Sequence, residues 1–123
     1  MPPSDDADRL LDRLYALLGA QDPAFVADVL QDFLAELPGI VQSLTDAHAR
    51  QDLDALRRGA HKLRSSAHAL GGVGIAETAA PLEAAAYAGD AKSLPLLLDA
   101  LLAEVASYER TARAVLNRLE EIP

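Results

Sequence analysis

Cysteine and tryptophan are absent from the 123 residues, and aromatic residues make up only 4% of the chain. Without cysteine the protein can form no disulfide, no thiolate nucleophile and no cysteine-ligated zinc site. Basic residues are also scarce, because 11 Lys and Arg stand against 19 Asp and Glu, which gives a formal net charge of -8. A surface of this sign repels nucleic acid and anionic membranes, so we expect neither as a partner.

Long hydrophobic runs are missing as well. No apolar segment approaches the roughly 20 residues of a membrane span, and the acidic start MPPSDDADRL lacks the apolar core of a signal peptide. We therefore expect a cytoplasmic protein. The length fits one domain over residues 1–123. We expect its core at about residues 22–119 and flexible tails at residues 1–3 and 120–123.

Leu and Ala must fill the core, and both are strong helix formers, whereas β-branched residues are few. Apolar residues recur at alternating spacings of three and four, which is the period of an amphipathic helix. Asp22 is placed as an N-cap, the third helix opens near Asp52, and Gly19 and the stretch GGVG supply helix ends. The pattern predicts helices over residues 4–18, 23–47, 52–70, 75–88 and 94–119.

Four long apolar stripes with short connections predict an all-α fold, an antiparallel four-helix bundle of the last four helices. The first helix, with a stripe of Leu10, Leu14 and Leu17, is a short extra N-terminal helix across one end. Pro38 lies inside the second helix and should kink it, and Pro81 lies inside the fourth. Because the stripes are used within the bundle, we expect a monomer.

The window AHKLRSSAHALGG, residues 60–72, contains the candidate functional residues. On a helical wheel His61 lies roughly 130° from the centre of the apolar stripe, so it faces water. Its face and flank also carry Arg57, Arg58, Arg64, Ser65 and His68. Four of the 11 basic residues lie close together here: Arg57, Arg58, Lys62 and Arg64. This positive island suits a phosphoryl group or an acidic partner; the alternative is a solvated basic face paired with nearby acids.

The hairpin formed by the third and fourth helices turns near Gly72, which places residue 83 level with residue 61. Residue 83 is a glutamate, and a carboxylate bound to one imidazole nitrogen leaves the other unprotonated and directed outward. The alternative is a Glu83 that points to solvent. The same argument applied to the second and third helices, which turn near residue 50, puts Pro38 and Gly39 level with His61. A kinked, small neighbour there leaves space around the ring. The alternative is a kink that serves packing only.

These residues resemble the signature of histidine-containing phosphotransfer (HPt) domains. The signature has a phospho-accepting His, a hydrophobic residue two positions later, a basic residue, a glycine, small residues and a hydrophobic-Gly pair. The corresponding residues are His61, Leu63, Arg64, Ser65, Ser66 and Leu70–Gly71. FLAELPGIVQSL before the motif and LEAAAYAGD after it are similar too, so the resemblance spans roughly residues 22–116.

The resemblance implies a role for each matching position. His61 matches the phospho-acceptor, Arg64 the basic residue that steadies the phosphoryl group, and Glu83 a residue that hydrogen-bonds the imidazole. Ser65 departs from the usual glycine, which affects how closely a partner approaches. A partner would dock on the surrounding face, which carries Arg57, Arg58, Lys62, Ser65 and His68.

A protein of this family needs no cofactor and no metal of its own and is not an enzyme. Its partners are response-regulator receiver domains and a (hybrid) histidine kinase. The receiver supplies the acceptor Asp, its acidic pocket and Mg²⁺.

Several alternatives stay open. The chain could be an HPt-like docking module that is not phosphorylated, or the excised HPt domain of a larger hybrid sensor kinase. His68 is a rival acceptor on the same face, and His48 is expected at the surface near a helix C-terminus. A metal site is not expected, because His61 and His68 are seven residues apart, which is about 10 Å along a helix.

Overall fold

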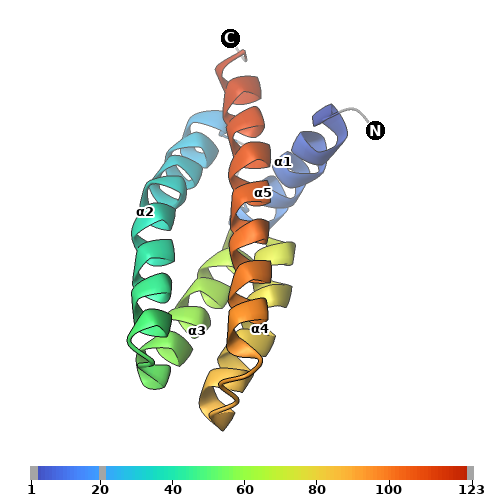
Figure 1. Cartoon of the computed structure of the whole chain (residues 1–123). Helices are drawn as coiled ribbons and strands as arrows, with labels where there is room; N and C mark the ends of the chain where they lie inside the picture. The colour runs from blue at the N-terminus through green and yellow to red at the C-terminus, as the bar shows by residue number, and fades with distance from the viewer. Residues whose placement is uncertain (1–2, 20–21, 122–123) are drawn as a thin grey trace.

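The computed structural model describes residues 3–19 and 22–121, which fold into helices without a strand (Figure 1). The helices are α1 (Pro3–Leu18), α2 (Pro23–Ala49), α3 (Leu53–Ala69), α4 (Val73–Ala88) and α5 (Leu94–Glu120). Within this part of the chain, no helix combines the length and the hydropathy that a membrane span requires. The all-α prediction is confirmed.

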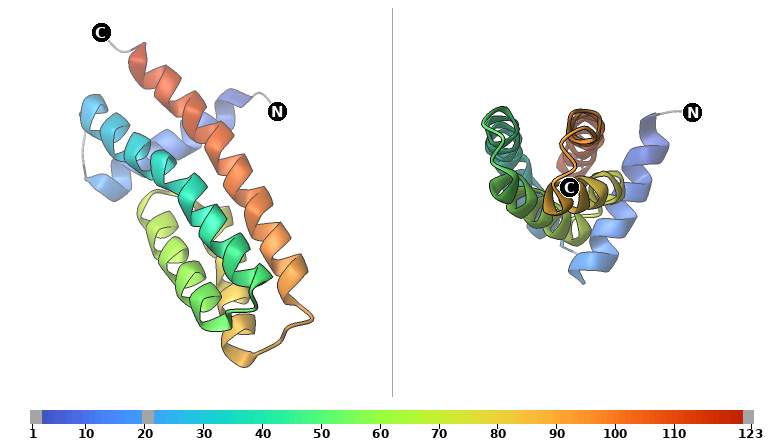
Figure 2. Two further views of the ribbon diagram at one scale, coloured as in Figure 1. Left: turned by 60° about the vertical axis from the view of Figure 1, so that its left-hand side comes forward. Right: turned by 60° about the horizontal axis from the view of Figure 1, so that its bottom comes forward.

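Helices α2 to α5 form the predicted bundle, with α3 and α4 packed closely as a hairpin. Helices α2 and α5 have 27 residues each, against 17 in α3 and 16 in α4. Their ends therefore extend past the α3–α4 turn, and α1 crosses this end, packed mainly on α5 (Figures 1 and 2). The extra helix α1 has 16 residues, as many as α4.

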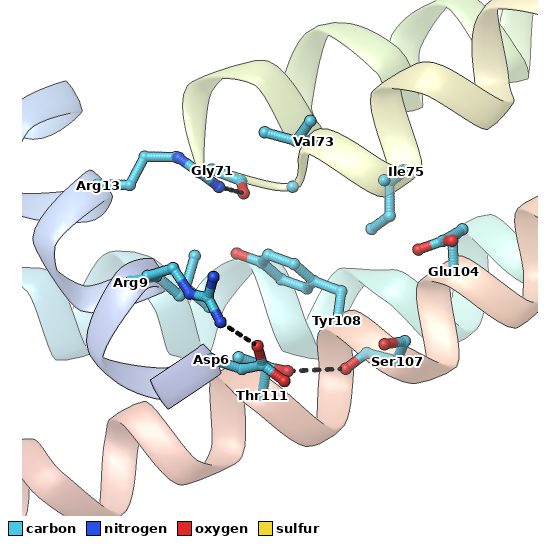
Figure 3. A pocket seen from close by; sticks show the side chains of 13 residues that line it. Asp6, Arg9, Arg13, Gly71, Val73, Ile75, Glu104, Ser107, Tyr108 and Thr111 are labelled. Atoms are coloured by element: carbon cyan, nitrogen blue, oxygen red, sulfur yellow. Dashed lines mark hydrogen bonds and ion pairs between the residues drawn. The ribbon is translucent and has the colours of Figure 1, made fainter. Parts of the chain in front are cut away.

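The α3–α4 turn is held against α1 and α5. Gly71 adopts φ +72°, which a side chain would strain, and a Cβ there would lie 3.0 Å from Leu10. The Arg13 guanidinium donates to the Gly71 carbonyl at 3.2 Å across a cleft of about 350 Å³ (Figure 3). The Tyr108 hydroxyl donates to the Leu70 carbonyl at 2.7 Å, and burial raises the pKa of Tyr108, which keeps this donor protonated. The turn that orients α3 relative to α4 is thus fixed from two sides.

Some sequence-based expectations need correction. Leu17 was expected inside but is 49% exposed, whereas Ala7 is fully buried, because α1 presents its Ala7, Leu10 and Leu14 face to the bundle. Helix α4 begins at Val73 rather than Ile75, because only Gly71 adopts a left-handed conformation and Gly72 already serves as the N-cap.

The two internal prolines lie in helices that continue through them. Pro38 and Pro81 are both on exposed positions. A carbonyl that loses its helical partner on a solvent-facing side can bond to water instead, so each proline is tolerated.

Parts of the expected tails are helical, since α1 includes Pro3 and α5 extends to Glu120. The rest of those tails, residues 1–2 and 122–123, lies outside the described residues. That the whole chain forms one domain remains a prediction.

Gly39 offers a test of the α2 backbone. It lies inside α2, and a Cβ built on it meets no atom within 4 Å. Gly39→Ala should raise the free energy of unfolding by about 0.5–1 kcal/mol, because alanine loses less conformational entropy in a helix. Thermal unfolding followed by circular dichroism measures it. Gly71→Ala is the control and should lower stability, since its φ and its contact with Leu10 both oppose a Cβ; a stabilised Gly71→Ala would contradict this explanation.

Candidate functional site

Helix α3 separates a buried face from an exposed one. The Asp52 side chain caps the helix by accepting from the Ala55 N–H at 3.1 Å, which sets where its faces begin. One face is fully buried and consists of Leu56, Ala60, Leu63 and Ala67. His61 projects from the opposite face, where 55% of its side chain is exposed.

Glu83 on α4 joins His61 to Arg64. Its Oε2 lies 2.9 Å from His61 Nδ1, and its Oε1 accepts from Arg64 Nε at 3.0 Å. The Glu83 side chain is only 21% exposed. The hairpin register therefore places this glutamate where the sequence predicted it, and the carboxylate is held at both oxygens.

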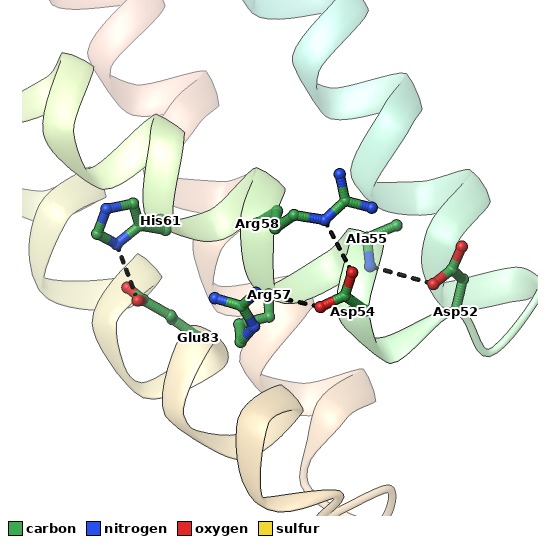
Figure 4. A network of polar contacts seen from close by, with 7 residues as sticks. All are labelled: Asp52, Asp54, Ala55, Arg57, Arg58, His61 and Glu83. Atoms are coloured by element: carbon green, nitrogen blue, oxygen red, sulfur yellow. Dashed lines mark hydrogen bonds and ion pairs between the residues drawn. The ribbon is translucent and has the colours of Figure 1, made fainter.

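This contact selects the tautomer of the imidazole. An ionised carboxylate can only accept, so Nδ1 carries the proton and donates it to Glu83. Arg64 Nη2 also lies 3.3 Å from Nδ1, but a protonated Nδ1 has no lone pair to accept from it. In the neutral ring Nε2 is then unprotonated, and Figure 4 shows it on the side of the ring away from Glu83. The site therefore holds an oriented, exposed imidazole whose second nitrogen is free to accept.

A comparison with protein-family models finds the Hpt domain over residues 28–121, which is most of the chain. The chain belongs to the Hpt domain family. Hpt domains act in histidine phosphotransfer in phosphorelays, where they interact with kinases and response regulators, and they are generally carriers rather than enzymes. None of the curated proteins and none of the solved structures compared with the chain matches it significantly.

Two arginines of the positive island in this Hpt domain have an acidic partner on their own helix. Asp54 accepts from Arg57 at 3.1 Å and from Arg58 at 2.9 Å (Figure 4). The hydrogen bond from Arg57, with that from Arg58, holds the pKa of Asp54 below its ordinary value. Arg57 and Arg58 are thus paired with a nearby acid on an exposed face, as the alternative of a solvated basic face predicted. Exposed ion pairs of this kind contribute little to stability.

The other candidate docking residues lie on α3 with His61. Lys62, Ser65 and His68 are all exposed. Lys62 also lines a groove of about 660 Å³ between α2 and α3, together with Gly39 and Gly59. Gly39 thus lines a space between the two helices, but neither Pro38 nor His61 does, so open space around the imidazole stays a prediction.

Among residues 3–19 and 22–121, no group of three or more His, Asp or Glu side chains is placed to hold a metal ion. His48 is half-buried in the last turn of α2 rather than fully at the surface.

Two residues near the site were missed at the level of sequence. Asp54 is the partner of Arg57 and Arg58, and its spacing of three and four from them on one helix was a usable signal. Tyr87 lies four positions after Glu83, on the same face of α4, and is 82% exposed. That spacing was also visible in the sequence, but only the packed hairpin shows that this face borders the His61 site.

Proposed function

We propose that this Hpt domain is a phosphoryl carrier that uses His61 to exchange a phosphoryl group with the Asp of a response-regulator receiver domain. The observation that supports this most is the hydrogen bond between His61 Nδ1 and Glu83, which leaves Nε2 unprotonated and exposed. A ring held this way directs the lone pair of its neutral form toward an incoming phosphorus.

The proposed phosphoryl transfer needs few groups from this chain. The Nε2 lone pair attacks the phosphorus of an aspartyl phosphate, the P–O bond to the aspartate breaks, and the carboxylate leaves on the receiver. The Nδ1 proton stays with the Glu83 hydrogen bond throughout. The charge that develops on the phosphoryl oxygens needs Mg²⁺ and positioned cations, and the receiver supplies the metal.

Arg64 has a double role in this proposal. In the free chain its Nε binds Glu83, and its Nη2 lies 3.3 Å from the ring of His61. It therefore buttresses the carboxylate that orients the imidazole. Because a phosphoryl group on His61 carries nearly two negative charges, a guanidinium one helical turn away also attracts it.

The direct test incubates the chain with phosphorylated receiver domains from the same organism and locates the labelled residue by mass spectrometry. We expect acid-labile, base-stable phosphate on His61 and on neither His48 nor His68. Label confined to His68, or no label with any receiver, would contradict the proposal.

Glu83 gives a graded test of orientation. Glu83→Ala removes the acceptor for Nδ1, so the ring is no longer fixed in one tautomer, and the transfer rate should fall roughly ten- to hundredfold, as for loss of a charged hydrogen bond. Glu83→Gln keeps an acceptor oxygen and should retain most of the rate. Rapid-quench measurement of the transfer rate checks both.

Glu77→Ala is the matched control, because Glu77 is exposed and lies earlier on the same helix. It should transfer at the parental rate. A Glu83→Ala variant as fast as Glu77→Ala would remove Glu83 from the site.

A further inference from the structure

We propose that the α4 face beyond Glu83, centred on Tyr87, is part of the surface on which the receiver domain docks. The inference rests on the proposed function of His61. It adds an α4 contact to the docking residues expected on α3.

Tyr87 lines a groove that shares two side chains with the His61 site. The groove between α3 and α4 has a volume of about 450 Å³, and its lining residues are Arg57, Arg64, Ala80, Glu83, Ala84 and Tyr87. Two of these, Arg64 and Glu83, are the side chains that contact the His61 ring. The groove is therefore continuous with the transfer site.

The exposure of Tyr87 is informative because Tyr87 lies in the groove beside the His61 site. Single exposed apolar side chains are common and need no explanation. Tyr87, however, is the most exposed large hydrophobic residue of the described chain, at 82%. Tyrosine and arginine are the side chains enriched at binding hot spots, and here one tyrosine lies in a groove with two arginines.

The size of a docked domain makes contact with Tyr87 expected. A standard interface buries about 800 Å² on each partner, which corresponds to a patch of roughly 16 Å radius. Glu83 Oε2 is 2.9 Å from the His61 ring, and Tyr87 follows Glu83 by one turn, about 6 Å along α4. A receiver centred on Nε2 of His61 therefore covers this part of α4.

Charge favours the same occupant. The chain has a net charge of -8, so an acidic receiver pocket is repelled by most of its surface. Arg57 and Arg64 line the groove beside Tyr87, where they pair with Asp54 and Glu83. With Arg58 and Lys62 nearby on α3, four cations stand against these two carboxylates, so the charge next to His61 remains positive. An acidic pocket with an apolar rim fits this arrangement of two cations and one aromatic ring.

The test is Tyr87→Ala, assayed with the receiver that labels the parent chain fastest. The receiver concentration for half-maximal transfer should rise about tenfold, as for loss of an aromatic hot spot, while the limiting rate stays unchanged. Phosphorylation of His61 by phosphoramidate, which needs no docking, should also stay unchanged. Tyr87→Phe should keep most of the affinity.

Phe25→Ala is the matched control. Phe25 is an exposed aromatic residue, 46% accessible, in the first turn of α2 at the end of the molecule that α1 crosses. It should leave the half-maximal concentration at the parental value. Tyr87→Glu is a second variant, which keeps a helix-forming residue and should weaken docking further by repelling an acidic partner.

The outcomes separate the two proposals. If His61 is labelled but Tyr87→Ala and Tyr87→Glu both behave like the parent, the docking inference is wrong and the proposed function stands. If the parent takes up no label from any receiver, the proposed function fails and the docking inference fails with it.

Discussion

Replacing His61 by glutamine should abolish phosphate uptake from a phosphorylated receiver. The amide has no nitrogen lone pair that can attack phosphorus, whereas Nε2 of the neutral ring has one. Because 55% of the His61 side chain is exposed and the buried face of α3 is untouched, the helical content and the thermal midpoint should stay at parental values. Acid-labile label in the purified chain, with circular dichroism alongside, measures both.

His68→Gln is the matched control for this result. His68 lies on the same helix and is exposed, but no contact with Glu83 is found in the described structure. Its variant should incorporate label as the parent does. Retention of label in His61→Gln together with its loss in His68→Gln would exchange the two assignments.

Of the substitutions proposed for this chain, Leu63→Ala should produce the largest loss of stability. Leu63 is fully buried, two positions after His61, on the face of α3 that contacts the rest of the bundle. A buried Leu→Ala change removes transfer energy and leaves a cavity, which costs about 2–5 kcal/mol. Since small domains have about 5–15 kcal/mol in total, the thermal midpoint should fall by roughly 10–20 °C. Thermal and denaturant unfolding measure the change.

Leu96→Ala makes the same chemical change at an exposed position. Leu96 is 77% accessible on α5, so its truncation should alter the free energy of unfolding by less than about 0.5 kcal/mol. Equal losses for Leu63→Ala and Leu96→Ala would show that burial does not control the stability of this bundle.

Local signals were sufficient for most helix boundaries. Asp22 accepts from the Ala24 N–H at 3.0 Å just before Pro23, as its sequence context predicted, and α3 begins beside Asp52, where the third helix was expected to open. Caps and proline positions depend on a few adjacent residues, so they can be read without the fold. The N-terminal limit of α4 was misplaced, because GGVG supports several turn geometries and only packing selected the left-handed Gly71.

The side of α1 that is buried could not be read in the same way. Leu10 and Leu14 are buried as expected, but Leu17 is exposed and Ala7 takes the remaining inner position. A helix that crosses the end of a bundle meets its neighbours at an angle, so its buried patch does not run parallel to its own apolar stripe. The position of α1 on α5 decides which residues of α1 are buried. Helical periodicity alone does not reveal that position.

Periodicity, caps and the residues around position 61 were enough to determine a helical bundle with an outward-facing imidazole, because these properties arise within single helices. The hairpin register also indicated Glu83 as a partner of His61, but which ring nitrogen it holds, the support from Arg64 and the place of Tyr87 beside them were decided only when α3 and α4 packed together. Such contacts depend on rotamers and on a hairpin register accurate to one residue, and no stretch of sequence on one helix specifies the position of another.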